Sequence, residues 1–337
     1  GPGVHERMGR YDSWIREVTA AAGPRPVWLY LCSDHGMVDV VEHADLMSRV
    51  ARPLARGETV LASGFDIQPG GKGSNAAIAC ARQGARVAVL ARLGDDDFGR
   101  MALALWAREG IDASAVEVAS GERSGVAQIL VYDDGDNSIA VAPGAGAALD
   151  AGHARAAAAL LRGARVVMAS CEVPLAVTLA AFALAREGGA ITLLNPAPAR
   201  PLPTELLALT DLLTPNETEL KSLAGVDDTE AAARALLAQG PRAVLATLGR
   251  RGAALFERDR PPLRLPGHAV AVADTIGAGD TLTGALAAAL ARGEPIEAAA
   301  RWANAAAALS VTGHGAIGGM PTRDAVAALL ARPPSET

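Results

Sequence analysis

Residues 274–281 read Asp-Thr-Ile-Gly-Ala-Gly-Asp-Thr and stand directly before a long stretch rich in Ala and Leu. The stretch at 279–292 predicts a helix, and the small residues before it let the backbone approach a ligand closely. The first N–H groups of a helix have no partner inside it and lie at its positive end, so this turn predicts an anion site. Asp280 at the same place can take a proton from a hydroxyl while those N–H groups hold negative charge. Phosphoryl transfer to an alcohol has these requirements, although a plain Gly turn with a helix-capping Asp has the same pattern.

Outward from this turn, short β-rich runs alternate with longer segments rich in Ala and Leu. Strands are predicted at 86–92, 165–169, 190–194 and 243–247. Helices are predicted at 98–109, 174–187, 217–224, 229–238, 279–292 and 296–311. This alternation predicts an α/β fold with a doubly wound, mostly parallel sheet and helices on both faces.

Two stretches break this rhythm, because 58–67 and 125–141 read as strands without a helix between their runs. The second contains Asp-Asp-Gly-Asp-Asn at 133–137, a strong turn signal. Strands of this kind predict either a flap over a site or an antiparallel extension of the sheet edge.

Length, composition and charge narrow the class of protein. A chain of 337 residues that is 50% apolar and 20% charged predicts one large globular domain. No apolar run approaches the ~18 residues of a membrane span, and a net charge of −6 argues against a general nucleic-acid binder. The cysteines Cys32, Cys80 and Cys171 are too few and too scattered for a disulfide framework or a zinc site. We therefore expect reduced thiols and a cytoplasmic protein that binds neither nucleic acid nor membrane.

A second Gly-rich segment, Pro-Gly-Gly-Lys-Gly-Ser-Asn at 69–75, also precedes an Ala-rich helix. It is not a Walker A loop, because Asp66 occupies the place of the first Gly and Gly73 that of the Ser or Thr. Its glycines together with Asn75 can hydrogen-bond a polyol. The alternative is a structural turn capped by Ser74.

Three further segments have a structural interpretation, although the run at 195–200 is ambiguous by itself. Asn216 and Glu219 have the spacing of a capping box at the start of a helix. The run Asn-Pro-Ala-Pro-Ala-Arg at 195–200 predicts a rigid loop after a strand. The acidic run at 95–97 favours a turn and a helix cap over a metal site.

Together and in this order, these segments resemble the ribokinase-like pfkB family of carbohydrate kinases, from about residue 37 to residue 330. The segments at 70–75 and 274–280 are similar to the two signatures of that family. Those at 195–200, 214–219, 247–249 and 302–316 resemble the ribokinase branch within it. The resemblance implies a kinase domain over about 37–332. It also implies a small β lid with strands within about 46–68 and 122–142, which makes the dimer contact in ribokinases.

The resemblance also implies a role for each matching residue. Asp280 matches the catalytic base, and the anion hole matches Gly277, Ala278 and Gly279. The sugar-binding positions match His43, Asp45, Gly71, Lys72, Asn75 and Glu172, together with Asp280. The ATP-binding positions match Asn216, Thr247, Gly249, Gly252, Gly279 and Asn304. Glu219 matches the acidic position linked to Mg²⁺ and phosphate. A site for a monovalent cation such as K⁺ matches Asp274, Ile276, Ser310, Gly313, Gly315 and Gly319.

The chain departs from the family pattern in its first strand, which usually ends in Gly-Ser-x-Asn-x-Asp. Asp45 is kept, but Val40 replaces the Gly and His43 replaces the sugar-binding Asn. Imidazole differs from an amide in shape and hydrogen bonding, which puts specificity for ribose in question. Residue 76 is Ala, where ribokinases usually carry Gln.

Residues 1–36 have no counterpart in the family pattern. Gly1-Pro2-Gly3 resembles the remnant of a protease cleavage site. We hypothesise that the remaining extension reflects a start codon assigned too early. N-terminal sequencing of the native protein tests this, because peptides from 4–36 would contradict it.

The expected activity is that of a sugar kinase that transfers the γ-phosphate of ATP, most simply to O5 of D-ribose to give ribose 5-phosphate. Mg²⁺ and K⁺ are the expected ions, and a homodimer through the lid is the expected assembly. The alternatives are a kinase of the same family for fructose, a keto-deoxy sugar acid or an adenosine-type nucleoside, or a non-catalytic sugar or nucleotide sensor. Because only 3% of the residues are aromatic, nucleosides rank below sugars.

Overall fold

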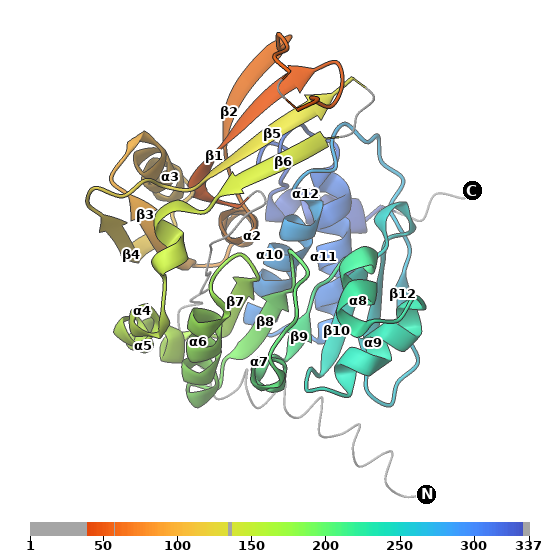
Figure 1. The fold of residues 1–337 in the computed structure, drawn as a ribbon. Helices are drawn as coiled ribbons and strands as arrows, with labels where there is room; N and C mark the ends of the chain where they lie inside the picture. Colours follow the sequence, from red (N-terminus) through yellow and green to blue (C-terminus); the bar gives the residue numbers. More distant parts are fainter. Residues whose placement is uncertain (1–38, 57, 134–136, 333–337) are drawn as a thin grey trace, which may run out of the picture.

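The chain folds into an α/β body with a small separate sheet above it (Figure 1). The computed structural model describes residues 39–56, 58–133 and 137–332. In the body, the strands are β7 (Val166–Ser170), β8 (Ile191–Asn195), β9 (Leu212–Leu213), β10 (Ala243–Thr247), β11 (Ala253–Glu257) and β12 (Leu263–Leu265). Their order is β12-β11-β10-β9-β8-β7, and β7 to β10 run parallel while β11 and β12 are antiparallel at one edge. A parallel pair, β3 (Ala88–Gly94) and β4 (Asp112–Ala119), forms a further piece of sheet. The predicted doubly wound, mostly parallel α/β architecture is confirmed.

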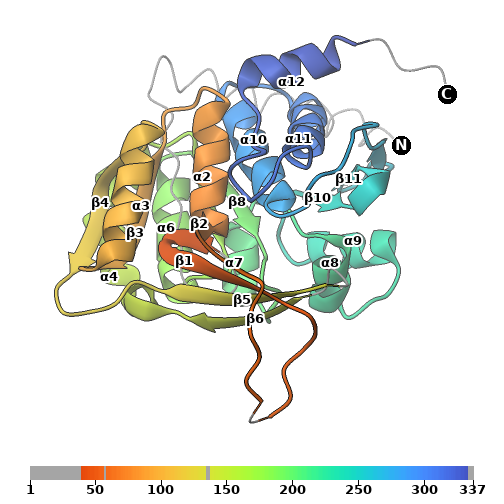
Figure 2. The same ribbon diagram turned by 90° about the horizontal axis from the view of Figure 1, so that it is seen from above.

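Helices cover both faces of this sheet, as predicted. On one face lie α2 (Lys72–Arg82), α3 (Asp97–Arg108), α10 (Ala278–Ala291), α11 (Ile296–Ser310) and α12 (Arg323–Leu330). On the other lie α4 (Ala151–Ala156), α5 (Ala158–Gly163), α6 (Leu175–Glu187), α7 (Thr204–Leu209), α8 (Glu217–Ala224) and α9 (Thr229–Leu237). Figure 2 shows α2, α10 and α11 side by side. In the described part of the chain, no helix is long and apolar enough to cross a membrane.

The apolar strands build two cores because alternate side chains of a strand point to opposite faces. Val166 and Met168 of β7 pack with α2 and α10, whereas Val167 and Ala169 pack with α6. Parallel strands buried on both faces therefore read as continuous apolar runs, which made them easy to predict. Burial also raises the pKa of the Cys80 thiol to about 12, so that this free cysteine stays protonated.

The upper sheet is the predicted lid, made of β1 (Asp39–Val50), β2 (Gly64–Gly71), β5 (Val126–Tyr132) and β6 (Asn137–Ala142). Its order is β2-β1-β5-β6, and β1 runs antiparallel to β2 and parallel to β5. A four-stranded sheet apart from the body agrees with the flap interpretation and not with an extension of the sheet edge. The strand predicted at 58–67 is wrong in its first half, because β2 begins only at Gly64. Glu58 instead accepts the Ala55 N–H at 2.8 Å and pairs with Arg52, which closes a turn.

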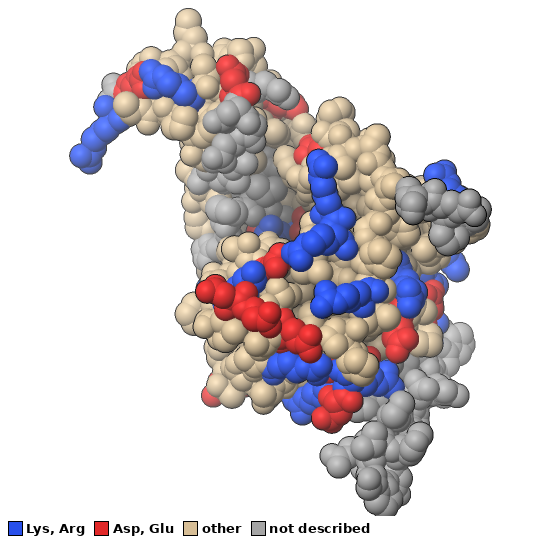
Figure 3. Space-filling model, turned by 90° about the vertical axis from the view of Figure 1, so that its right-hand side faces the viewer, with Lys and Arg blue, Asp and Glu red and all other residues tan. Residues whose placement is uncertain are grey.

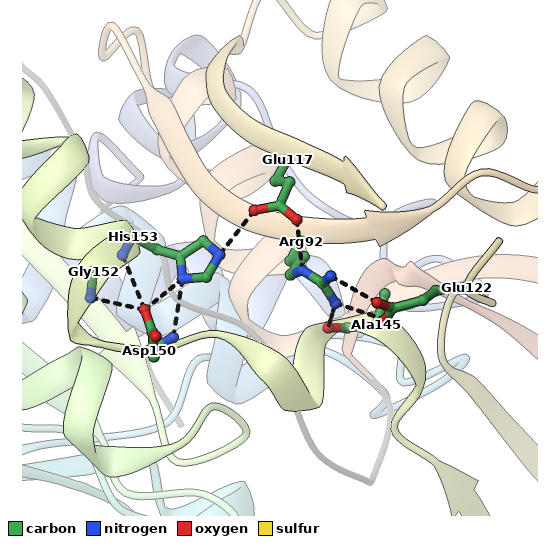
Figure 4. Close-up of polar contacts among 7 residues, drawn as sticks. All are labelled: Arg92, Glu117, Glu122, Ala145, Asp150, Gly152 and His153. Atoms are coloured by element: carbon green, nitrogen blue, oxygen red, sulfur yellow. Dashed lines mark hydrogen bonds and ion pairs between the residues drawn. The ribbon is translucent and has the colours of Figure 1, made fainter. Parts of the chain in front are cut away.

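The base of the lid is joined to the body through Arg92 on β3 (Figure 4). Its guanidinium donates to Glu117 on β4 at 2.8 Å and to both carboxylate oxygens of Glu122, just before β5, at 2.6 and 2.7 Å. It also donates to the carbonyl of Ala145, in the short 3₁₀ helix that follows β6, at 2.8 Å. The other carboxylate oxygen of Glu117, Oε2, lies 2.9 Å from Nε2 of His153 on α4. One side chain therefore holds the segments by which β5 and β6 leave and rejoin the body.

We expect the variant Arg92→Met to lower the melting temperature at pH 7 by a few degrees, and by less at pH 3. Hydrogen bonds from Arg92 hold the pKa of Glu117 and of Glu122 below their usual range. A carboxyl group whose pKa is lower in the folded state stabilises the fold above its unfolded pKa of about 4.3. That contribution is lost as the pH falls through the folded-state pKa.

Thermal unfolding from pH 7 to pH 3 measures this difference. The matched control is Arg100→Met, which removes an exposed arginine paired with Asp97 on the surface of α3. An Arg92→Met effect that is the same at both pH values would contradict the assignment of Arg92 to these carboxylates.

Candidate active site

The N-terminus of α10 is built by a glycine that no other residue can replace without strain. Gly277 caps the helix with φ = +76°, and its carbonyl accepts the Thr281 N–H at 2.8 Å. A Cβ on Gly277 would lie 2.8 Å from the carbonyl oxygen of Ala316. Asp280 sits in the first turn of the helix and is 6% exposed. The predicted base thus lies buried at the positive end of α10.

The two Gly-rich segments of the sequence meet at one hydrogen bond. Asn75 Nδ2 on α2 donates to Asp280 Oδ2 at 3.0 Å, although the two residues are 205 positions apart. The helices can come this close because Gly284 of α10 faces α2, where an added Cβ would lie 2.2 Å from the carbonyl oxygen of Ala76. The structure therefore brings a predicted sugar-binding residue directly against the predicted base.

Glu219, in the first turn of α8, interacts electrostatically with Lys72 and Asp280. Burial raises the pKa of its carboxyl, a backbone hydrogen bond from Asn216 and the charge of Lys72 lower it, and the charge of Asp280 raises it further. The predicted capping box is present. The Asn216 N–H donates to Glu219 Oε2 and the Glu219 N–H donates to Asn216 Oδ1, both at 2.8 Å. Glu219 thus caps a helix and also places a second carboxylate near Asp280.

The remaining predicted sugar positions lie in the lid sheet, at the start of α2 and after β7. Gly71 ends β2 with φ = +115°, Lys72 begins α2, and Glu172 is 1% exposed just after β7. The side chains of His43 and Asp45 lie outside the described residues, although the backbone of Asp45 pairs with Gln68 in the lid sheet.

The structural alternative for the segment at 69–75 was wrong in its capping residue. Ser74 lies inside α2 and accepts a hydrogen bond from Trp106 Nε1 at 2.8 Å, while Gly71 is the residue that precedes the helix. Because the helix begins at Lys72, the Ser74 hydroxyl is already past the position at which it could cap.

A cleft of about 620 Å³ opens beside the N-terminus of α10. Five of the predicted ATP positions line it, namely Thr247, Gly249, Gly252, Gly279 and Asn304. Asn216 does not line the cleft, but its backbone pairs with that of Thr247. Asn304 donates to the carbonyl of Pro266 at 2.9 Å, which ties α11 to the loop on the cleft's outer side.

Several residues that line the cleft were not predicted. They are Arg250, Gly267, His268, Ala269, Val270, Val272, Thr275, Leu282, Ala307, Ala308 and Val311. Helical spacing from Asn304 points to Ala307 and Ala308, and adjacency to Gly249 points to Arg250. The segment at 267–272 gave no such signal, because its place beside the cleft depends on long-range packing.

The six positions predicted for a monovalent cation lie in two loops and, for Ser310, at the end of α11. The carboxylate of Asp274 accepts the Ile276 N–H at 3.0 Å and the Gly315 N–H at 2.9 Å, so it joins the two loops. Gly319 packs against the Ser310 carbonyl so closely that a Cβ would lie 1.9 Å from that oxygen. Backbone carbonyls and a carboxylate are the kinds of donor that suit a hard cation, and the predicted cation site stays a prediction.

The loop that ends this region is held from the far end of α2. Arg82 donates to the carbonyls of Ile317 at 2.8 Å and Met320 at 3.2 Å, and it pairs with Glu109 at 2.8 Å. Helix α2 therefore carries a predicted sugar-binding residue near its start and holds the predicted cation loop at its end.

The surface on this side of the molecule is hollowed beneath the lid sheet, and basic side chains lie along the edge of the hollow (Figure 3). A buried carboxylate at a helix N-terminus, beside a cleft partly lined by apolar groups, is an arrangement compatible with phosphoryl transfer to an alcohol. The model of the pfkB family of carbohydrate kinases matches residues 35–323, and the chain belongs to this family.

Within the family, the chain is similar to ribokinases. It is 39% identical to the ribokinase of Bacillus subtilis over 279 residues, which cover 83% of this chain and 93% of that protein. It is 37% identical to the ribokinase of Haemophilus influenzae over 272 residues, 79% of this chain and 89% of that protein. The solved structure of Arabidopsis thaliana ribokinase complexed with ribose and ATP superposes with a TM-score of 0.82 at 31% identity, covering 92% of this chain and all of that one.

Proposed function

We propose that this kinase phosphorylates D-ribose with ATP and releases ribose 5-phosphate and ADP. The contact between Asn75 and Asp280 carries the proposal, because it sets an orienting amide against a buried base. Gly279, the neighbour of Asp280, lines the cleft that we assign to ATP. The similarity to ribokinases along most of the chain supports ribose as the acceptor.

The reaction follows from the placement of these groups. The ribose hydroxyl attacks the γ-phosphorus, a new O–P bond forms, and the bond between that phosphorus and the bridging oxygen of ADP breaks. Asp280 accepts the hydroxyl proton during this step. The N–H groups at the start of α10, from Gly277 to Asp280, stabilise the charge on the transferred group. Asn75 donates to one oxygen of Asp280 and so orients the carboxylate for the acceptor.

Two ions complete the proposal. Mg²⁺ is usually bound by one or two carboxylates together with substrate phosphates, and Glu219 beside Asp280 fits that pattern. When bound, it would neutralise charge on the phosphates. A monovalent cation would be held by the carbonyl-rich loops around Asp274 and Gly319, next to the anion end of α10.

We also propose a homodimer that forms through the lid. Phe65 and Ile67 of β2 are 64% and 45% exposed, which leaves an apolar area on the lid sheet. Sedimentation at micromolar concentration tests this proposal, since a monomer would contradict it.

ADP release over a panel of acceptors tests the function. The panel contains D-ribose, 2-deoxy-D-ribose, D-fructose, a keto-deoxy sugar acid and adenosine, each with Mg-ATP and K⁺. We expect the highest kcat/KM with D-ribose. A preference for another acceptor would keep the chemistry and reassign the substrate. Binding of ATP without turnover on any of them would favour the sensor alternative. Assays without Mg²⁺, and with Li⁺ in place of K⁺, test the two ions.

A further inference from the structure

The cleft beside α10 has parts that suit different ends of a nucleotide. Apolar side chains from two segments line one part, among them Val272, Ala307 and Val311, and these suit a flat heterocycle. Ala278 and Gly279 at the start of α10 form the other part, which suits an anion. The short 3₁₀ helix η2 (Gly249–Arg251) contributes Gly249 and Arg250 to the lining of the same cleft.

Arg250 is the one lining residue of this cleft, in the described part of the chain, that carries a full positive charge at neutral pH. The other basic group, His268, is half-buried, and burial lowers the pKa of its imidazole, which keeps the ring neutral. The other lining residues are uncharged. A polyphosphate chain bound here would therefore meet one guanidinium in addition to the helix N-terminus.

The backbone of Arg250 has a defined position. Gly249 and Gly252 on either side have φ values of +59° and +90°. A Cβ added to Gly267 would lie 2.3 Å from the Arg250 carbonyl oxygen. Helix η2 therefore packs tightly against the loop after β12. This packing holds the start of a long flexible side chain at the edge of the cleft, while its exposed guanidinium remains free to turn toward a ligand.

Arg251, the next residue, differs from Arg250 because it forms an ion pair within the protein. Arg251 pairs with Glu217 on α8 at 2.5 Å, and Lys221 reaches the same carboxylate at 3.3 Å. Among the described residues, no carboxylate forms an ion pair with Arg250. Both adjacent arginines are exposed and carry the same charge, but in the part of the chain that the structure describes only Arg251 has an anionic partner.

We propose that Arg250 binds the polyphosphate chain of the nucleotide and makes the cleft prefer nucleoside di- and triphosphates over nucleosides. This rests on the proposed function, in which this cleft holds ATP. The planar guanidinium forms paired, charge-assisted hydrogen bonds with phosphate oxygens, an arrangement that a surface amide cannot reproduce. Arg250 is therefore a specificity-determining residue for the phosphate donor.

Titration calorimetry with ADP and with adenosine tests the proposal on four proteins: the wild type, Arg250→Gln, Arg250→Lys and the matched control Arg251→Gln. We expect Arg250→Gln to weaken ADP binding by about tenfold or more, the size of a lost charged hydrogen-bond pair. Adenosine binding should stay within about twofold, because a nucleoside offers no phosphate. Arg250→Lys should recover part of the affinity, and Arg251→Gln should bind ADP like the wild type. The salt dependence of ADP binding should become shallower in Arg250→Gln.

Each other outcome overturns a defined part of the proposal. Equal losses for ADP and adenosine would mean that Arg250 contacts the adenine or that the substitution disturbs the whole cleft. Equal losses in Arg250→Gln and Arg251→Gln would reduce the effect to general surface charge. Unchanged ADP binding in Arg250→Gln would show that the Arg250 side chain does not contact the bound nucleotide. A wild-type protein that binds neither ligand would refute the nucleotide cleft, and with it the proposed function, rather than the role of Arg250 alone.

Discussion

Asp280→Asn should lower kcat at least ~10²-fold, the lower range for a lost general base, while the protein stays folded and still binds ADP. The asparagine keeps the size of the side chain, but it cannot take the proton of the acceptor hydroxyl. The neighbouring donor Asn75 would also face an amide in place of the carboxylate that it now contacts at 3.0 Å. Steady-state kinetics with the best acceptor of the panel measures the loss. Calorimetry with ADP shows that the cleft is intact.

The matched control is Asp324→Asn, which also replaces an aspartate in the first turn of a helix. Asp324 lies in the first turn of α12 and is exposed. It should keep wild-type kcat, because only its local effect on the helix changes. Turnover of Asp280→Asn near the wild-type rate would remove Asp280 from the role of base.

Gly284→Ala should lower both stability and turnover, although the same change in an open helix position is favourable. Alanine is better than glycine inside a helix by roughly 1 kcal/mol. Here, however, the added Cβ would lie 2.2 Å from the Ala76 carbonyl oxygen and 2.8 Å from the Ala79 Cβ. Because both neighbours belong to α2, the two helices must separate, at a cost of about 1–3 kcal/mol. The contact between Asn75 and Asp280 spans this same interface, and a shift of about 1 Å can reduce a rate up to ~10²-fold. We expect kcat to fall at least ~10-fold.

A control that overpacks the other core separates the two effects. Ala181 on α6 is fully buried on the opposite face of the sheet, far from the interface of α2 and α10 in the packing of the fold. Ala181→Val should lower the free energy of unfolding by a similar amount and leave kcat unchanged. Urea unfolding and kinetics on both variants decide the question. A Gly284→Ala protein with wild-type stability would show that the helices adapt without moving apart.

The sequence predicted those parts of the fold whose causes are local. Helix α8 has the predicted bounds, because Asn216 and Glu219 form the capping box that their spacing indicates. Strand β10 also has its predicted bounds, because an apolar run buried on both faces is unambiguous. Strand β2 was misplaced because its start depends on pairing with β1 and on the turn that Glu58 closes.

For the candidate site, the sequence named residues but could not give their arrangement. Both Gly-rich segments could be identified, but the hydrogen bond between Asn75 and Asp280 depends on the packing of α2 against α10. The electrostatic link of Glu219 with Lys72 and Asp280 was hidden for the same reason, since the spacing of Glu219 explains only its cap. Arg250 drew no prediction because arginine in a turn beside glycine is common on protein surfaces.

The division of the molecule into lid and body has an evolutionary consequence. Asp280, the start of α10 and the cleft that we assign to ATP belong to the body, whereas His43 and Asp45 lie on strand β1 of the lid sheet. The lid joins the body through the start of α2 and through the two segments that Arg92 holds. With the site residues in the roles that we propose for them, substitutions in β1 can change which acceptor is held without disturbing the groups that transfer phosphate. Position 43, where this chain has His in place of the family's Asn, lies on that strand, so the proposed function makes the lid the part of the chain in which acceptor choice can change while the donor chemistry of the body is inherited intact.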